Sequence, residues 1–390
     1  MWHEAERPGG QTLHARRSFI AGSAASLLAA GCTRLPAPRS SIADFRPGLV
    51  PIRFARDRLM KVTVCLRPFR PAGPRLEAER IGEKTIVHNY GHGGSGWSLL
   101  WGCAAEAAAL ALATGGRDIA VIGAGVIGLT TALRLVETGA QVTIYAAEFP
   151  AETRSARATG VWSPSSRIAL ADAVDAGFVE RWERWARASH AVHQQMVGMA
   201  GDPVEYLPQY NLAGGEEPQA RASHSFLHLD RRLRGLTPPW RQLEGAANPF
   251  PGRNVRSGPT MVFSVTEYAD RLMRLFLLRG GRMVRRDFAG REQILALGEK
   301  TICNCMGFGA KAIWQDAALV PVRGQINWLL PQAEAHYALY YDAVQVVSRA
   351  DGIVVQYLGP NEDWGYANAE ETPNPAETEL ALGRMQKIFS

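Results

Sequence analysis

The pattern of apolar and polar residues near the middle of the chain predicts a strand, a helix and a second strand in close succession. Residues 118–122 form a short apolar run, and apolar side chains recur at helical spacing over residues 129–136 before the chain reaches Gly139. A second apolar run follows at residues 141–145. Short apolar runs on either side of an amphipathic helix are typical of a parallel β-α-β unit. We therefore expect an α/β fold organised around this unit.

Three glycines between the first strand and the helix have the spacing of a dinucleotide fingerprint. Gly123 allows the tight turn, Gly125 lets the backbone approach a pyrophosphate, and Gly128 lets the helix pack closely on the strand. The pyrophosphate would face the free amides at the N-terminus of the helix. The predicted cofactor contacts in this unit are Gly123, Ala124, Gly125, Val126, Ile127, Gly128 and, for the ribose, Glu148. The alternative is a glycine-rich turn in another kind of α/β protein.

Other periodic segments predict the remaining elements. Helical spacing covers about residues 99–113 and 266–278, and helical stretches are expected between residues 168 and 259, with Phe178, Trp182 and Trp185 interpreted as core side chains. Alternating apolar residues from 326 to 355 predict the strands of a second sheet.

Composition and charge narrow the classes of function. The chain has 390 residues, of which 46% are hydrophobic, so it can bury the cores of about two domains. Its net charge of +6 comes from 43 basic and 37 acidic residues that are scattered along the chain, so nucleic acid is not an expected partner. The five cysteines form no CxxC pair and no cluster with histidine at metal-site spacing, so no metal site is expected.

The first 35 residues are typical of an export signal rather than of a folded domain. Arg16-Arg17-Ser-Phe-Ile precedes an alanine-rich stretch that ends near Ala30, which resembles a twin-arginine signal. The apolar stretch of about 12 residues is shorter than the roughly 20 that span a bilayer. We expect residues 1–35 to direct export to the periplasm or cell envelope, with Cys32 as a candidate lipid anchor and residues 36–60 as a linker. The alternative is a disordered tail with an accidental arginine pair.

Two motifs lie before the fingerprint. Arg-Pro-Phe-Arg-Pro occupies residues 67–71, and His-Asn-Tyr-Gly-His-Gly-Gly occupies residues 88–94. Both resemble motifs of the D-amino-acid oxidase family, in which they lie near the C-terminus. The chain therefore resembles a circularly permuted member of that family, with residues 114–117 joining the two parts. Further segments at residues 160–164, 301–307 and 321–325 extend the resemblance over about residues 61–357.

The resemblance implies a Rossmann-like FAD-binding domain with a second, α+β substrate domain. It assigns residues 61–168 and 256–320 to the FAD-binding domain, and residues 169–255 and 321–390 mostly to the substrate domain. It implies that FAD is the cofactor. The additional FAD contacts that it implies are Gly93, Gly94, Ser95, Gly96, Trp97, Ser98, Gly160, Trp162, Ser163 and Gly307.

An amino-acid oxidase must hold the carboxylate of a zwitterionic substrate. A guanidinium does this with two parallel hydrogen bonds, whereas an ammonium is a less directional point charge. Arg67 is the candidate for this clamp, and the nearby Arg70 and Arg75 are the alternatives. The resemblance assigns the substrate amino group to the carbonyl of Gly94 and a place in the pocket to Tyr341.

No side chain is expected to act as a catalytic acid or base, because hydride transfer from a neutral amine requires none. His88 and His92 are therefore interpreted as structural. The resemblance implies an FAD-dependent oxidase that converts D-amino acids to imino or 2-oxo acids, with O2 reduced to hydrogen peroxide. Gln345 stands where a second pocket tyrosine is expected. Oxidation of glycine or another small amine, and a degenerate flavin-binding exported protein, remain alternatives.

Overall fold

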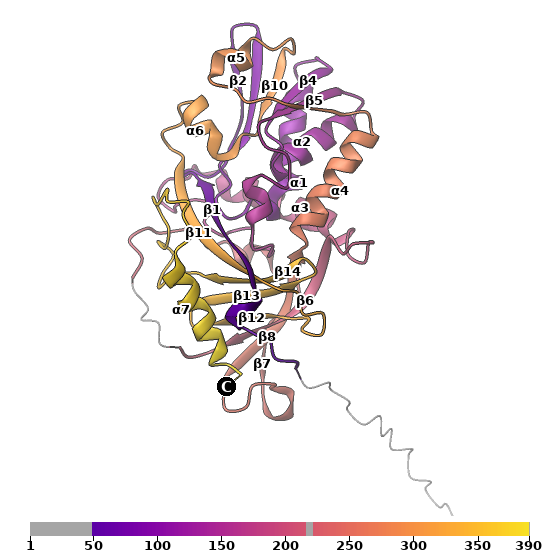
Figure 1. Cartoon of the computed structure of the whole chain (residues 1–390). Coiled ribbons are helices and arrows are strands. Elements are labelled where there is room, and N and C mark those ends of the chain that lie inside the picture. The colour runs from indigo at the N-terminus through magenta and orange to yellow at the C-terminus, as the bar shows by residue number, and fades with distance from the viewer. Residues whose placement is uncertain (1–48, 216–220, 390) are drawn as a thin grey trace, which may run out of the picture. The chain divides into compact units, whose positions relative to one another are not determined.

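The loop that begins the dinucleotide fingerprint follows strand β4 of a six-stranded sheet. The strand order of this sheet is β2-β3-β10-β4-β5-β9. β2 is antiparallel to β3, and all other neighbours in this sheet are parallel. The computed structural model describes residues 49–215 and 221–389, and these lie in one unit, Gly48–Ser390 (Figure 1). The bounds of the strands are β2 Arg75–Ile81, β3 Lys84–Tyr90, β4 Asp118–Ile122, β5 Gln141–Ala146, β9 Arg282–Arg285 and β10 Thr301–Asn304. The predicted parallel unit is confirmed in β4 and β5.

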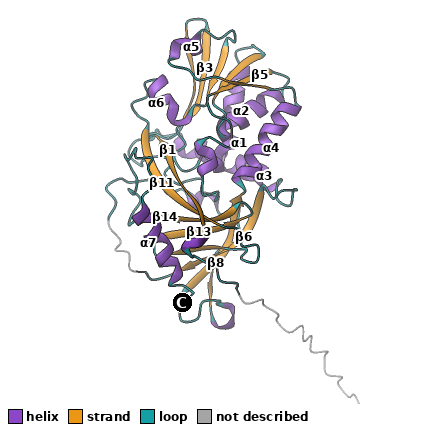
Figure 2. Cartoon of the chain, in the orientation of Figure 1, coloured by secondary structure: helices purple, strands orange, loops and turns teal. Residues whose placement is uncertain are grey.

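Helices cover both faces of this sheet. Successive side chains of a buried strand point to opposite faces, so the residues of β4 divide between two cores. Ile119 and Val121 of β4 contribute to one core with the helices α1, α2 and α4, whereas Ala120 and Ile122 belong to a second core with α5 and α6 (Figure 2). The bounds of these helices are α1 Gly96–Leu112, α2 Val126–Val136, α4 Val265–Leu278, α5 Arg291–Leu295 and α6 Ala310–Ile313. This arrangement confirms the predicted α/β fold class.

An eight-stranded sheet forms the other half of the unit, in the order β1-β11-β14-β13-β12-β6-β8-β7. Only β12 and β6 are parallel neighbours in it. Its strands are β1 Leu59–Phe69, β6 Val204–Leu212, β7 Arg241–Leu243, β8 Val255–Phe263, β11 Val320–Leu329, β12 Ala338–Tyr341, β13 Val344–Arg349 and β14 Gly352–Tyr357. The helix α7, Pro375–Gln386, packs against β13 and β14. Four of these strands, β11 to β14, confirm the strands expected between residues 326 and 355.

The segment between residues 168 and 259 differs from the helical stretches expected there. Its described residues, 168–215 and 221–259, contain one α-helix, α3 at Phe178–Gln194, which packs on α1, and the strands β6, β7 and the start of β8. β6 pairs with β8 in a long antiparallel ladder. The conformation of β6 therefore depends on a strand that is remote in sequence, and the apolar pattern of β6 alone does not reveal it. Trp182 and Trp185 of α3 are buried with Phe178, which confirms that these aromatic side chains belong to the core.

Segments near opposite ends of the chain share the eight-stranded sheet. β1 pairs with β11, and β11 pairs with β14. The ends of the described chain also meet, because the rings of Phe54 and Phe389 stack with centroids 6.3 Å apart and Gln386 donates a hydrogen bond of 2.8 Å from Nε2 to the carbonyl of Phe54. β1 therefore belongs to the sheet opposite the fingerprint, although the predicted boundary assigns residues 61–69 to the FAD-binding domain.

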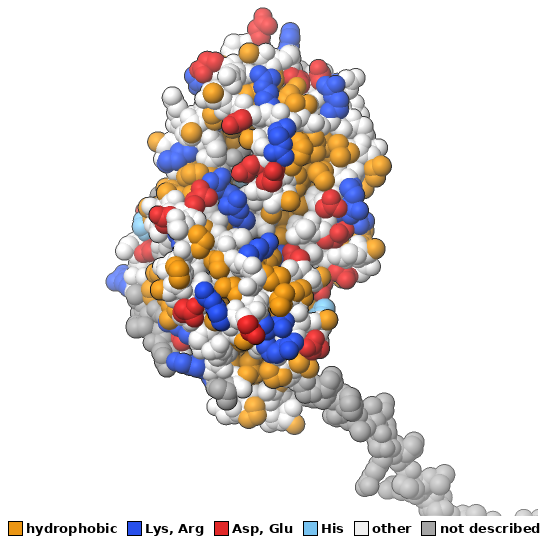
Figure 3. All heavy atoms as spheres, viewed as in Figure 1, with side chains coloured by type: hydrophobic (Ala, Val, Ile, Leu, Met, Phe, Trp, Pro, Cys, Tyr) orange, Lys and Arg blue, Asp and Glu red, His pale blue; other side chains and the backbone are white. Residues whose placement is uncertain are grey.

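Among the described residues, every helix is too short or too polar to span a membrane. On the face in Figure 3, basic and acidic side chains are interspersed. The predicted export signal and Cys32 lie outside the described residues.

Candidate functional site

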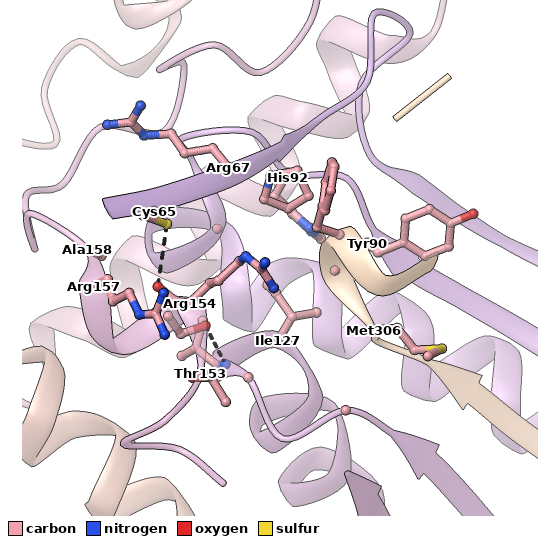
Figure 4. A pocket seen from close by; sticks show the side chains of 18 of the residues that line it. Cys65, Arg67, Tyr90, His92, Ile127, Thr153, Arg154, Arg157, Ala158 and Met306 are labelled. Carbon is pink, nitrogen blue, oxygen red and sulfur yellow. Dashed lines mark hydrogen bonds between the residues drawn. The ribbon is translucent and has the colours of Figure 1, made fainter. Parts of the chain in front are cut away.

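A cavity of about 600 Å³ lies between the two sheets, at the carboxyl ends of β4 and β5 (Figure 4). This is the edge at which doubly wound sheets bind their ligands. The fingerprint loop and the loop before α1 form part of the wall, and β1 and β11 of the eight-stranded sheet close it from the other side. The predicted residues that line the cavity are Arg67, Gly93, Gly94, Gly96, Trp97, Gly123, Ala124, Gly125, Val126, Ile127, Glu148, Gly160, Ser163 and Gly307.

The three fingerprint glycines differ in their backbone geometry and in the space around them. Gly123 has a φ of 106°, and a Cβ there would lie 2.6 Å from the carbonyl oxygen of Cys305. A Cβ on Gly128 would collide with the carbonyl of Gly123, so this glycine lies behind the cavity wall. A Cβ on Gly125 would meet only the Ser155 hydroxyl, at 3.2 Å. Its open side faces the cavity, which leaves the space that a pyrophosphate needs.

Four predicted cofactor residues support the site from behind instead of lining it: Gly128, Ser95, Ser98 and Trp162. The hydroxyl of Ser95 donates to the carbonyl of Ser166 at 3.0 Å, and the hydroxyl of Ser98 accepts from the amide of Ser163 at 2.8 Å. These bonds fix the loop before α1 and the first turn of α1 to the segment that begins at Gly160. Trp162 packs its ring edge-on against His190 and His193.

Arg67 lines the cavity from β1 and lacks a carboxylate partner among the described residues. Its Nη1 donates a hydrogen bond of 3.3 Å to the carbonyl of Arg323. A Cβ on Gly324, its neighbour in β11, would collide with the guanidinium, so the missing side chain there provides its space. Burial lowers the pKa of Arg67 below its usual value. Arg67 is half-buried, and a cation partly removed from water without a paired carboxylate is stabilised by an anion that completes the site.

The two alternative arginines are already paired. Arg70 Nε lies 3.0 Å from Oδ2 of Asp316. Arg75 contacts Glu77 at 2.7 Å and Glu79 at 3.2 Å. Neither arginine lines the cavity. The geometry therefore selects Arg67 from the three candidates for an anion clamp.

The two histidines of the 88–94 motif differ in their surroundings. His88 lies outside the cavity, with Nε2 2.8 Å from Glu79 and Nδ1 3.1 Å from Asn304 Nδ2. His92 lines the cavity, and burial lowers its pKa to about 4, so the ring is neutral at neutral pH. Nε2 of His92 and Oδ1 of Asn89 are buried without a partner among the described residues. Both residues line the cavity, so a bound group with polar edges would complete their hydrogen bonding.

Tyr341 does not line the cavity, contrary to its predicted place in the substrate pocket. It is buried in the core beside β14, with the guanidinium of Arg253 5.0 Å from its ring centroid. In the β12–β13 hairpin Tyr341 lies opposite Val344, and Gln345 lies opposite Tyr340. Since directly paired residues share a face and the face alternates along a strand, Tyr341 and the cavity-lining Gln345 point to opposite sides. Gln356 also lines the cavity and contacts the Thr159 hydroxyl.

Several cavity residues were missed from the sequence. The short helix η2, Arg154–Arg157, brings two arginines and Ser155 to the cavity beside the start of α2 (Figure 4). The Ser155 hydroxyl accepts a hydrogen bond of 3.0 Å from the amide of Val126, and the two arginines share Glu371. Their place soon after the second strand of the unit was the available signal, since ligands lie beyond the carboxyl ends of strands. Arg167 and Arg286 also line the cavity.

The residues present fit an FAD. The cavity combines a glycine cradle, several arginines for a pyrophosphate and unpartnered polar edges beside the loop before α1. Within residues 49–215 and 221–389, no group of three or more His, Cys, Asp or Glu side chains could hold a metal ion.

Comparisons with known proteins agree with this fit. Residues 118–390 match the family model described as "DAO: FAD dependent oxidoreductase". The chain is 27% identical over 226 residues to a D-amino-acid oxidase of Streptomyces coelicolor, a match that covers 55% of this chain and 62% of that protein. It is 55% identical over 60 residues to a D-amino-acid oxidase of Rubrobacter xylanophilus, covering 15% and 18%. The matches thus span less than two thirds of the length of these relatives. A solved iminodiacetate oxidase from Chelativorans sp. BNC1 is similar at 17% identity and a TM-score of 0.49, covering 70% of this chain and 78% of that one.

Proposed function

Because this chain belongs to the FAD-dependent oxidoreductase family that its residues 118–390 match, and FAD is accordingly its cofactor, we propose that it oxidises D-amino acids to imino acids. The imino acid hydrolyses to a 2-oxo acid, and O2 is reduced to hydrogen peroxide. The observation that carries this proposal is the half-buried Arg67 guanidinium, which lines the cavity and has no carboxylate partner among the described residues. A substrate carboxylate supplies the missing counter-charge.

The protein's part in the reaction is binding and orientation. FAD, when bound, would supply the redox chemistry, as the acceptor of the substrate hydride and the donor of electrons to O2. Arg67 holds the carboxylate, and the carbonyl of Gly94 accepts a hydrogen bond from the amino group. Gly94 is fixed for this role because its amide donates a hydrogen bond of 3.1 Å to the carbonyl of Ser166. His92 is neutral at neutral pH, so it adds no positive charge that would repel the substrate amine.

A second candidate reaction is oxidation of glycine or another small amine. Gln345 lines the cavity at the position where a second pocket tyrosine was expected, and Gln356 also lines it, which favours a small or polar substrate over a large apolar one. A protein that binds flavin without turnover is the third possibility.

Anaerobic reduction of the bound flavin separates these possibilities. We expect the visible absorbance of the purified holoprotein to bleach with D-amino acids and to stay unchanged with their L-enantiomers. Bleaching by glycine or by carboxylate-free amines alone would replace the proposal with the second reaction. A flavin that no amine reduces would leave a binding protein.

We further propose that the chain is a circularly permuted member of its family. The support is the order of its motifs together with the meeting of Phe54 and Phe389, which brings the ends of the described chain side by side. A chain that begins at residue 116, continues to residue 389 and passes through a short glycine linker into residues 49–115 should therefore fold with the same flavin spectrum and thermal midpoint. Failure of this reordered chain to fold, while the natural order folds, would contradict the permutation.

We also propose export by a twin-arginine route to the periplasm or cell envelope, on the strength of Arg16, Arg17 and the alanine-rich stretch after them. Replacing both arginines by lysine should retain the protein in the cytoplasm, measured by cell fractionation and immunoblotting. Arg34→Lys is the matched control outside the motif. Unchanged export of the double variant would contradict this route, and Cys32→Ala tests whether the exported form carries a lipid.

A further inference from the structure

Two arginines from distant segments meet in the cavity. Arg67 lies on β1, and Arg167 lies in the loop that follows the Gly160 segment, yet both line the same space. The loop before α1 holds the two segments together, since the amide of Gly93 donates to the carbonyl of Pro68 at 2.8 Å and that of Gly94 donates to Ser166 at 3.1 Å. A Cβ on Gly93 would collide with the carbonyl of Arg167, so this glycine permits the close approach.

Arg167 forms no ion pair with any described carboxylate. Its Nε donates a hydrogen bond of 3.0 Å to the carbonyl of Glu362, and its terminal nitrogens have no partner among the described residues. The nearest acidic side chains are engaged elsewhere: Glu362 lies 3.0 Å from Nε2 of His228, and Asp363 lies 2.9 Å from Nδ1 of His224. Their charges act on Arg167, but neither carboxylate lies within ion-pair distance of its guanidinium.

Electrostatics and backbone geometry support a binding role for this pair. Burial, with the charge of Arg67 as the next cause, lowers the pKa of Arg167 to about 10, so both guanidinium groups stay charged at neutral pH. Arg167 also has a φ of 46°, in the left-handed region that residues other than glycine rarely adopt. Strained positions of this kind are concentrated at ligand sites. Two adjacent cations that repel each other are favourable only when anions lie between or beside them.

We propose that Arg167 binds a second carboxylate, so that the enzyme prefers acidic D-amino acids. This inference rests on the proposed function, since Arg67 is taken to hold the α-carboxylate of an amino-acid substrate. Arg167 then receives the side-chain carboxylate, and a bidentate guanidinium suits that group. The amides of Gln345 and Gln356, which line the same cavity, provide a polar surround for a charged side chain.

The experiment compares each acidic substrate with its uncharged isostere. For the wild-type holoenzyme, we expect kcat/KM and the anaerobic bleaching rate to be higher with D-aspartate or D-glutamate than with D-asparagine or D-glutamine. Arg167→Asn suits the test because asparagine tolerates the left-handed backbone. We expect it to lower kcat/KM for the acids about 30-fold or more, the loss typical of a desolvated charge pair, and to change the amides by less than about 3-fold. Arg167→Lys should recover part of the loss because it keeps the charge.

The exposed Arg234→Asn is the matched control and should alter neither substrate class. Equal losses on acids and amides would overturn the inference, because Arg167 would then serve the α-carboxylate or the loop. An unaffected Arg167→Asn, or a wild-type enzyme that shows no preference for the acids, would also overturn it. The proposed function stands in all of these cases provided that neutral D-amino acids reduce the flavin, and it fails only if no D-amino acid does.

Discussion

Replacing Arg67 with lysine should lower kcat/KM for a D-amino acid by about 30-fold to several-thousand-fold, because losing a charge-assisted pair in a desolvated site costs about 2–5 kcal/mol. Lysine keeps the charge but loses the planar fork that binds a carboxylate through two parallel bonds. Arg67→Ala should lower it further. Flavin content and thermal midpoint should change little, since the guanidinium bonds only the carbonyl of Arg323 and fills the space over Gly324.

Two controls separate a carboxylate clamp from a structural role. Arg75→Lys alters an arginine of the same stretch that is paired with Glu77 and Glu79 outside the cavity, and it should leave kcat/KM unchanged. A carboxylate-free amine analogue never uses the clamp, so its slower turnover should respond little to either substitution at Arg67. Equal losses on the amino acid and the amine would assign Arg67 to structure.

The sequence predicts those parts of the fold that local chemistry decides. The fingerprint is contained within about thirty residues, so a tight turn, a helix and two strands follow from its own spacing. The structure gives the three glycines different surroundings: Gly123 has a positive φ, Gly128 lies against the backbone of Gly123, and Gly125 has open space beside it. Arg67 was likewise accessible from the sequence, although only the pairing of Arg70 and Arg75 with carboxylates decides among the three arginines.

The rest depends on partners that lie far apart in the chain. β6 is a strand because β8 pairs with it, which no local period reveals. The side of the sheet to which Tyr341 points depends on the register of the β12–β13 hairpin, because a shift of one residue would move each side chain to the opposite face. Arg167 joins the site only because the loop before α1 binds both Pro68 and Ser166.

Gly125→Val should yield folded protein without flavin. The two added methyl groups would occupy the open side of Gly125, where the backbone is predicted to approach the pyrophosphate, and protein atoms approach an added Cβ only at the Ser155 hydroxyl, 3.2 Å away. A side chain that overlaps a rigid ligand cannot be relieved by repacking, so we expect FAD affinity to fall on the order of 100-fold or more, about 3 kcal/mol. The flavin-to-protein absorbance ratio measures the loss.

The choice of glycine makes this test specific for the cofactor. Substitutions at Gly123 or Gly128 would collide with the backbone of Cys305 or Gly123, so they would damage the fold and lose flavin indirectly. Gly298→Val, at an exposed glycine with open space around it, is the matched control and should keep its flavin. Circular dichroism and the thermal midpoint of Gly125→Val should match those of wild-type protein stripped of FAD, because both proteins have an empty cradle and differ only in the side chain at residue 125. Stoichiometric flavin in Gly125→Val would place the pyrophosphate elsewhere, and the arginines of η2 would then be the next candidates to hold it.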